Sequence, residues 1–466
     1  MTESIQLLGE LRSNAGLPWG IAGGGSGGSI WVSTTTLSGT GFARARGNSQ
    51  GGGGRIAIHA TACSIPTTNF DTYSSFAGPG TVYFAIGSER PKLIFDNLQT
   101  SPRTSGVAAS PLDINLPGGD VVFSRCAIVA PSITVHAENI RIDGAHLFTS
   151  GFGYEAGQGP GRGLDGEGNA LGGGGGHGGR GGPGQVLNRD LGGPTYGSAI
   201  QPMEPGSGGD LQANAQPRDN PSGGGAVRLI ANSFQHFGRI FCDGGHGGPV
   251  GAGAAGGSVW ITANTIEGTG FISANGSTAR SSSGGGGRIA IYSCSGALPP
   301  ANVTVTGPAS AEDGSLAIAP LAVQLSPFTD PCFRATLILN ATAAGIGQLT
   351  YQWQREGLLL EDGDQPSGAT IAGAQSTSLT IHNFTPADVA SYQLVVTSAC
   401  GSVTTPPAQP SLCLADTDCD GDTDAADTTA FFTQWDAANP TADLDTDGDT
   451  DSDDIITFFS AWNSGC

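Results

Sequence analysis

The sequence predicts a mainly β protein in three parts. We expect a glycine-rich parallel β-helix or related β-solenoid over residues 1–320, a β-sandwich over 321–410, and a small pair of loop–helix motifs over 411–466. Three observations lead to this prediction: a long internal duplication, a run of short strand-like segments, and aspartates placed at alternate positions. A chain of 466 residues is also too long for one ordinary hydrophobic core, which favours several domains.

The first part contains two copies of one long segment. Residues 27–47, GGSIWVSTTTLSGTGFARARG, match residues 256–276, GGSVWITANTIEGTGFISANG, and GGGGRIAI recurs at 51–58 and 284–291. Apolar residues alternate within each copy, and glycine turns separate the segments. Short alternating strands between regular glycine turns are typical of a chain wound into stacked coils, so the duplication predicts a solenoid.

Two further segments, 132–146 and 228–240, have the same alternation and are expected to form additional coils. Residues 151–225 between them are rich in Gly, Pro, Asn and Gln and nearly lack apolar residues. Such a segment offsets little of its ordering entropy by burial, so we expect a long loop, with packed polyglycine-II helices as the alternative. The first copy begins in mid-repeat near Ser4, so we also expect the natural chain to extend upstream, which would explain why no export signal is visible.

Bulk composition excludes several functions. The net charge is −21, which argues against nucleic acid or an anionic membrane surface as the partner. No apolar run reaches the roughly 18 residues needed to cross a bilayer. The nine cysteines form no CxxC pair, which weakens zinc and redox-motif interpretations and favours an oxidising, extracellular setting.

Residues 321–410 resemble a bacterial immunoglobulin-like domain. The resemblance rests on LTYQWQREG at 349–357 and SLTIHNFTPADVASYQLVV at 378–396. Trp353 matches the core tryptophan of strand C in that family. The tyrosine-corner pattern D-x-[AG]-x-Y is matched by Asp388, Ala390 and Tyr392.

One family feature is missing from this second part. Leu394 stands where the strand F cysteine belongs, and the strand B segment at 335–341 offers only aliphatic residues as partners. We therefore expect Cys332 and Cys400 to form a disulfide elsewhere in the sandwich.

Two twelve-residue stretches in the third part have the spacing of a calcium loop. DTDCDGDTDAAD at 416–427 and DLDTDGDTDSDD at 443–454 both place acids at positions 1, 3, 5, 7, 9 and 12 and glycine at position 6. Alternate carboxylates repel one another until a dication makes them ligands, and glycine permits the sharp turn. The sequence therefore predicts two Ca²⁺ sites, formed by Asp416, Asp418, Asp420, Asp422, Asp424, Asp427, Asp443, Asp445, Asp447, Asp449, Asp451 and Asp454.

A short aromatic helix is expected after each loop, TTAFFTQW at 428–435 and IITFFSAW at 455–462. The aromatic residues of the two segments match at a constant offset of 27, so we expect them to meet in a small core that the metal nucleates. A disordered acidic tail is the alternative. Two loops in phase, each with an equivalent helix, argue against that alternative.

The third part resembles a dockerin. CLAD at 413–416 and the terminal WNSGC are similar, more narrowly, to the GC-type dockerin-like modules that end many secreted proteins of planctomycete-type bacteria. The resemblance implies attachment or sorting at the cell surface, and a disulfide between Cys413 and Cys466. The partner it implies is a cell-surface anchoring or cohesin-like protein, or an envelope polysaccharide. We expect a monomer.

The sequence departs from the dockerin pattern in three ways. Position 8 is threonine in both loops, where an aliphatic residue is usual, and Cys419 at position 4 is additional. Positions 10 and 11, which contact the cohesin in cellulosomal dockerins, differ between the loops. This difference argues against a symmetric contact with a cohesin. The residues at positions 10 and 11 are Ala425 and Ala426 in one loop, and Ser452 and Asp453 in the other.

The solenoid offers no clear catalytic constellation. Lys92 is the only lysine, and the acids of residues 1–320 are scattered singly. Asp143-Gly-Ala-His146 and Asp243-Gly-Gly-His246 recur, but an aspartate before glycine most often makes a hydrogen bond in a turn. We predict no catalytic residue and no organic cofactor. The alternative is a carbohydrate-active enzyme or glycan-binding protein, which acids and aromatics stacked along one groove would favour.

Overall fold

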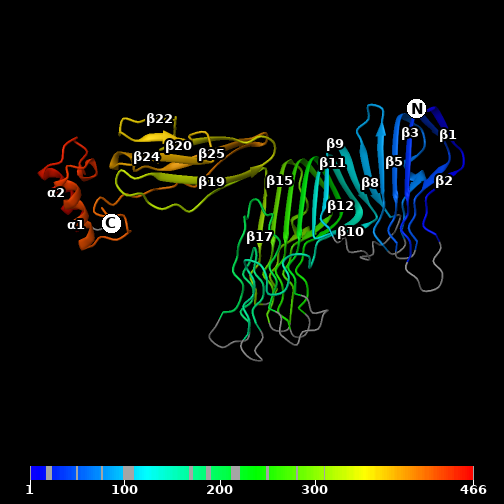
Figure 1. The fold of residues 1–466 in the computed structure, drawn as a ribbon, viewed down its shortest axis with the longest axis horizontal. Coiled ribbons are helices and arrows are strands. Elements are labelled where there is room, and N and C mark those ends of the chain that lie inside the picture. Colours follow the sequence, from blue (N-terminus) through cyan, green and yellow to red (C-terminus); the bar gives the residue numbers. More distant parts are fainter. Residues whose placement is uncertain are drawn as a thin grey trace. The chain divides into compact units, whose positions relative to one another are not determined.

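The computed structural model confirms a mainly β protein, which divides into two compact units, Met1–Pro320 and Leu321–Cys466 (Figure 1). Neither α-helix among the described residues is long and apolar enough to cross a membrane. The structure describes residues 2–16, 24–48, 51–74, 77–97, 110–166, 172–184, 190–210, 221–247, 251–279, 282–308 and 310–464.

The N-terminal unit is built on one long sheet in which neighbouring strands are parallel, except for the antiparallel pair β7–β8. Figure 1 shows its strands side by side, from blue to green. In spatial order the strands are β1 (Thr2–Leu7), β3 (Ser29–Gly39), β5 (Arg55–Cys63), β7 (Thr81–Ile86), β8 (Lys92–Asp96), β9 (Leu112–Ser124), β11 (Ser132–Phe148), β12 (Ala226–Phe241), β13 (Ser258–Gly268), β15 (Arg288–Ser295) and β17 (Ser315–Ala319).

Shorter parallel strands lie outside this main order of strands. β2, β4 and β6 form a separate sheet, while β10, β14 and β16 pair with the main strands or with each other. Their bounds are β2 Glu10–Arg12, β4 Phe42–Arg44, β6 Phe70–Asp71, β10 Ala127–Val129, β14 Phe271–Ser273 and β16 Val303–Thr304.

The strand register explains the alternation of apolar residues. Val227 pairs with Val259, and Val259 with Ile289, so that like residues stack across three strands. Each of the three is at most 1% exposed. Parallel pairing in register therefore places every second side chain in a continuous apolar core and the others outside it.

Glycine is required where the two copies turn. Gly39 and the equivalent Gly268 have φ values of +120° and +129°. A Cβ atom at these positions would lie 2.1 Å from the Leu7 carbonyl oxygen and 2.0 Å from the His236 carbonyl oxygen. Conformation and close backbone approach thus both exclude a larger residue.

The described parts of the glycine-rich insertion form no helix or strand, as a loop would, but much of this backbone is buried. Residues 172–176 are buried, yet they belong to no helix or strand. Gly174, Gly175 and Gly176 donate to the carbonyls of Gly182, Gly253 and Gly161 at 2.7–2.9 Å. Successive residues thus bond to different segments, as in packed polyglycine-II helices, the alternative that the composition allowed. Backbone hydrogen bonds and close contact replace the apolar burial that the sequence lacks.

The C-terminal unit contains two antiparallel sheets. One is ordered β18 (Leu321–Leu325), β19 (Leu337–Gly345), β24 (Ser378–His382), β23 (Thr370–Ala372) and β22 (Gly363–Asp364). The other is ordered β21 (Leu358–Leu359), β20 (Thr350–Arg355), β25 (Tyr392–Ser398) and β26 (Gly401–Thr404). We call this pair of sheets the sandwich.

The predicted sandwich core is present. Trp353 is fully buried, and its Nε1 donates to the Ser376 carbonyl at 3.0 Å. The Tyr392 hydroxyl donates to the Asp388 carbonyl at 2.7 Å, which is the geometry of a tyrosine corner. Leu394 is fully buried and fills the place of the missing cysteine with apolar volume.

The disulfide prediction for this unit is wrong. Cys332 bonds to Cys419, with the two Cα atoms 5.9 Å apart, and not to Cys400. The expected pairing of Cys413 with Cys466 lies outside the described residues, because Cys466 is not among them.

Two buried histidines predict a pH dependence in the N-terminal unit. Burial lowers the pKa of both His177 and His236 to about 4, against hydrogen bonds to the carbonyls of Gly256 and Phe271 that act in the opposite direction. Below pH 6.5 the unfolded chain takes up protons that the folded chain does not. The free energy of unfolding should therefore fall as pH drops from about 6.5 towards 4, by roughly 3 kcal/mol per histidine.

Urea unfolding of the full chain at pH 7 and pH 5 measures this loss. In the double variant His177→Asn and His236→Gln, which keeps amide donors that do not titrate, the loss should shrink. An unchanged loss in the double variant would contradict the assignment to these two residues.

Candidate metal centre

The two acidic loops, 416–427 and 443–454, lead directly into the two helices of the C-terminal unit. Helix α1 spans Ala425–Asp436 and helix α2 spans Ser452–Ser464. Gly421 and Gly448, at position 6, have φ values of +94° and +102°, and a Cβ at either would meet nothing within 4 Å. Backbone conformation, rather than crowding, therefore calls for glycine at this position, as predicted.

The carboxylate at position 12 closes each loop. Asp427 Oδ1 accepts the backbone N–H groups of Thr417 (2.7 Å) and Asp418 (3.1 Å), and its Oδ2 accepts that of Asp424 (2.8 Å). Asp454 accepts three N–H groups from the equivalent positions of the second loop. Each carboxylate thus keeps lone-pair capacity mainly on Oδ2, which accepts one N–H where Oδ1 accepts two.

The carboxylate at position 1 has one oxygen without a partner. Oδ1 of Asp416 and Oδ1 of Asp443 are buried, and neither accepts a hydrogen bond. Asp443 is only 6% exposed, and its Oδ2 accepts from Nη2 of Arg334 at 2.9 Å. A buried anionic oxygen without a partner is costly, and a bound cation would satisfy it.

Some of the other acids in the loops lie close to the carboxylates at positions 1 and 12, and others do not. Ligand atoms lie within 4.8 Å of one another in three sets: Asp416, Asp418 and Asp427; Asp422, Asp424 and Asp427; and Asp443, Asp445 and Asp454. The other four predicted ligands, Asp420, Asp447, Asp449 and Asp451, are in none of these sets. Asp424 and Asp451, both at position 9, each accept an N–H from the start of the following helix, at 2.7 and 2.8 Å. That geometry suits a position that reaches a metal through water.

Mutual repulsion raises the pKa of acids in both loops. The charge of Asp420 raises the pKa of Asp422, and the charges of Asp447 and Asp451 raise the pKa of Asp449. Burial by the loop would raise the pKa of Asp427, but its backbone hydrogen bonds outweigh this effect and lower the pKa. The loops therefore hold closely spaced carboxylates that a dication would relieve.

The aromatic residues meet as predicted. Phe431 of α1 and Phe458 of α2 are fully buried, and their rings stack with centroids 4.5 Å apart at an angle of 7°. Leu444, at position 2 of the second loop, lies in the same apolar cluster. The core between the helices thus fixes the positions of both loops.

A turn of the sandwich contacts both loops, which the sequence analysis missed. Cys332 is bonded to Cys419, Phe333 packs against the aromatic cluster, and Arg334 pairs with Asp443. Arg334 adopts a φ of +59°, a conformation that disfavours a residue with a Cβ, and its side chain makes the ion pair from this turn. Two signals were available in the sequence: the additional cysteine at position 4, and the fact that residues 321–466 hold only two basic residues, one of them Arg334.

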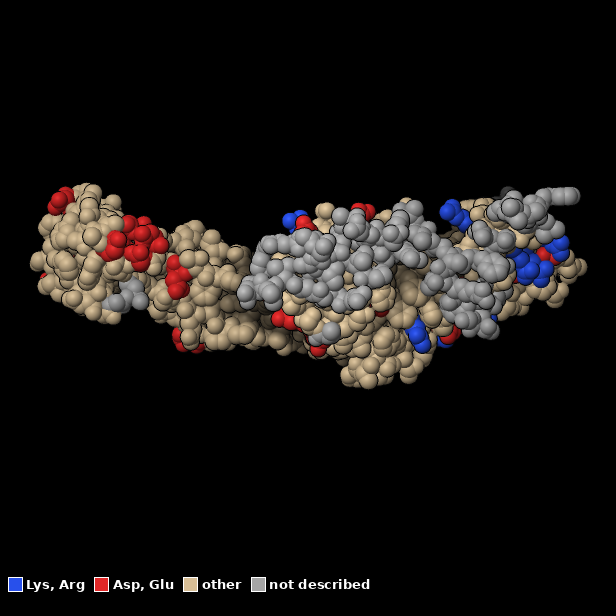
Figure 2. Space-filling view, turned by 90° about the horizontal axis from the view of Figure 1, so that it is seen from below, with Lys and Arg blue, Asp and Glu red and all other residues tan. Residues whose placement is uncertain are grey.

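Acidic side chains gather at the end of the C-terminal unit that carries the helices, and no basic side chain lies beside them on the face in view (Figure 2). The aspartate–glycine–histidine segments of the N-terminal unit form no comparable cluster. Asp243 accepts from the backbone N–H of Asn275 and the hydroxyl of Ser273. Asp143 pairs with Arg141. These contacts are structural, and they reach neighbouring residues rather than the nearby histidines.

Comparisons with known proteins do not name a family. No family model matches the chain, and no curated protein matches it. Similar solved structures include the N-terminal four Ig domains of Dscam1 isoform 6.9, at 20% identity, 23% of this chain, 24% of that chain and a TM-score of 0.17. Tandem Ig repeats of Dlar match at 15% identity, 23% of this chain, 58% of that chain and a TM-score of 0.17. The chain thus spans about a quarter of the Dscam1 chain, and TM-scores this low carry no argument.

Position 12 should matter more than position 9 for calcium affinity. Asp427→Ala removes a predicted direct ligand and leaves three N–H groups without an acceptor, whereas Asp424→Ala removes a helix cap and a ligand that is predicted to act through water. The difference should reach about 2 kcal/mol, roughly thirtyfold in affinity. Calorimetric titration of the full chain with calcium measures it. Equal losses in the two variants would contradict the assigned roles.

Loss of the disulfide should weaken the first loop. Non-reducing peptide mapping should recover a peptide pair that joins Cys332 to Cys419. Cys419→Ser should lower the free energy of unfolding of the C-terminal unit by about 3 kcal/mol, because the unfolded chain gains freedom. Cys63→Ser is the matched control, since Cys63 is a free cysteine in the other unit. An equal effect of both changes, or a Cys332–Cys400 peptide pair, would refute this pairing.

Proposed function

We propose that this chain is a non-catalytic, extracellular, modular surface protein of bacteria, attached or sorted through a calcium-dependent, dockerin-like C-terminal module. The solenoid and the immunoglobulin-like sandwich serve adhesion or spacing. The observation that carries the proposal is the pair of acidic loops, each with a buried carboxylate oxygen at position 1 that has no partner in the described structure.

The residues present fit a calcium ion. Calcium takes six to eight oxygen ligands in a flexible arrangement. Each loop offers carboxylates from positions 1, 3 and 12 within 4.8 Å of one another, and a glycine at position 6 with the required positive φ. When bound, the ion would supply positive charge that neutralises the loop. The chain's own residues fix the loop ends, Asp427 and Asp454 by accepting backbone N–H groups and Phe431 and Phe458 by stacking.

The N-terminal unit supports a spacing role. We interpret its parallel strands, whose paired residues are 19 to 32 positions apart in the chain where no insertion intervenes, as a β-solenoid. A solenoid of this kind extends one coil at a time and holds a fixed surface. Among its described residues, no group of three or more acids, histidines or cysteines brings ligand atoms close enough together to hold a metal ion.

The attachment surface of the module is asymmetric. Ile456 and Phe459 of α2 are 65% and 41% exposed, whereas the equivalent positions of α1 are Thr429 and the half-buried Phe432. Exposed apolar side chains next to a calcium loop are suited to contact a protein partner. We therefore propose that a cell-surface anchoring or cohesin-like protein contacts α2, with one binding face rather than two.

Attachment is tested with the full chain and isolated bacterial envelopes. Retention should require calcium and should be reversed by a chelator. Asp454→Ala should lose both calcium at the second loop and retention, because position 12 binds directly. Ile456→Asp should keep calcium and lose retention, because it changes only the exposed face of α2. Retention that is equal in calcium and in chelator would overturn the proposed function.

A further inference from the structure

The internal duplication gives the N-terminal unit two equivalent surface patches, one in each copy, and their surroundings differ. In the second copy, Ser258, Trp260, Arg288 and Tyr292 lie on one side of β13 and β15, and we call them the copy-two face. The equivalent residues of β3 and β5 are Ser29, Trp31, Arg55 and His59, the copy-one face. Strand register is the same in both: Ser258 pairs with Arg288, and Ser29 with Arg55.

A loop of the glycine-rich insertion covers the copy-two face. Arg288 Nε donates to the Tyr196 carbonyl at 2.8 Å, the Tyr292 hydroxyl to the Ile200 carbonyl at 2.7 Å, and the Ser258 hydroxyl to the Glu204 carbonyl at 2.6 Å. Ser258 and Tyr292 are fully buried as a result, and Arg288 is 8% exposed. All three donors recognise main-chain carbonyls, so the face binds an irregular loop by its backbone.

The loop is closed on itself. The Tyr196 hydroxyl bonds to the carbonyl of Pro205, which joins the two ends of the covering segment. Ile200 lies at the middle of this segment and is buried. The occupant of the copy-two face is therefore a closed loop of about ten residues with the buried Ile200 at its middle.

The copy-one face retains the donors but has no occupant among the described residues. Ser29 and Arg55 are exposed, and Trp31 is 69% exposed. His59 takes the place of Tyr292 and also carries a ring N–H donor. The Trp31 ring stacks on that of His59 at 4.4 Å, so the surface is ordered before anything binds.

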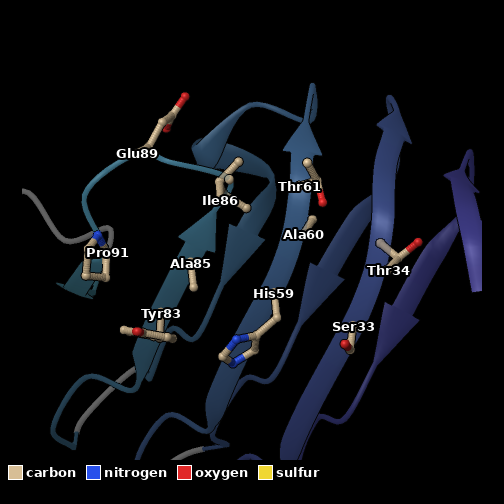
Figure 3. A pocket seen from close by; sticks show the side chains of 11 residues that line it. Ser33, Thr34, His59, Ala60, Thr61, Tyr83, Ala85, Ile86, Glu89 and Pro91 are labelled. Carbon is tan, nitrogen blue, oxygen red and sulfur yellow. The ribbon is translucent and has the colours of Figure 1, made fainter. Parts of the chain in front are cut away.

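A groove of about 440 Å³ continues this face beside His59. Figure 3 shows its lining, with Ser33, His59 and Tyr83 on neighbouring strands and Glu89 on the connection beyond β7. In the second copy, Tyr292, the equivalent of His59, donates to the Ile200 carbonyl. The groove beside His59 is thus the counterpart of the place where the covering loop binds Tyr292.

We propose that the copy-one face is a docking site for a loop of a separate partner polypeptide, an irregular Gly- and Pro-containing segment similar to residues 195–206, which it binds through main-chain carbonyls. Three side-chain donors recognise the backbone of such a loop, and the exposed Trp31 packs on it. This inference does not depend on the calcium loops.

The probe is a synthetic peptide of residues 195–206, closed by a disulfide between cysteines added at its two ends. Fluorescence anisotropy should show saturable binding to the full chain. Arg55→Gln and Trp31→Ala should each weaken binding about tenfold. Arg55→Gln loses a charged hydrogen bond, and Trp31→Ala loses a large apolar contact. Arg125→Gln is the matched control: it removes an exposed arginine of the same unit that pairs with Asp96, away from this face. No binding, or equal weakening in the control, would overturn the proposal.

Two further measurements test the occupant and the binding mode. If the chain binds cellohexaose but not the peptide, the copy-one face is a glycan site and the proposal is overturned. If the chain self-associates in sedimentation experiments and Trp31→Ala abolishes this, the face binds a second copy and the proposal is likewise overturned.

Tyr292→Phe removes only the hydrogen bond to the Ile200 carbonyl. It should speed hydrogen exchange in residues 196–205, and unchanged exchange would contradict recognition through carbonyls.

Discussion

Repulsion between carboxylates is the constraint on which the C-terminal unit depends. Thirteen aspartates occupy two loops of twelve residues, and Arg334 is the single basic side chain that pairs with one of them in the described structure. The loops are held in place by other means: backbone N–H groups on Asp427 and Asp454, stacked rings between the helices, and a disulfide to the sandwich. A scaffold that keeps like charges together in this way supports the proposed calcium sites.

The sandwich and the acidic loops are not independent modules connected only by the chain, because side chains of the two parts contact each other directly. The turn at Cys332, Phe333 and Arg334 contributes a covalent bond, an apolar contact and an ion pair. The ion pair uses Oδ2 of Asp443, and Oδ1 has no hydrogen-bond partner. A cation that binds Oδ1 would therefore be linked to the sandwich through one carboxylate.

The N-terminal unit is governed by a different constraint, the close approach of backbones. Parallel strands stack in register, and the buried glycine segments of the insertion bond to several neighbours at once. Polar atoms satisfy one another there without apolar side chains. The same insertion covers one copy of a duplicated face, and the other copy is left with equivalent donors and an exposed tryptophan.

Sequence reasoning succeeded where one local pattern determines one local structure. The tyrosine corner at Tyr392, the buried Trp353, the glycine at position 6 and the stacking of Phe431 on Phe458 all follow from short spacings. It failed where partners are distant in sequence. Cys332 and Cys419 are 87 residues apart, and many pairings of nine cysteines are compatible with the sequence. The loop interpretation of the insertion did not include a buried backbone, because low apolar content says nothing of how well glycine backbones pack.

The most direct measurement is the number of calcium ions that the full chain binds at equilibrium, by dialysis against calcium and metal analysis. The account predicts two ions per chain, with affinities between roughly micromolar and millimolar. Binding should be lost when Asp416 and Asp443 are both replaced by Ala, because these residues carry the unpartnered oxygens. A chain that retains no calcium above the dialysis buffer would contradict the account.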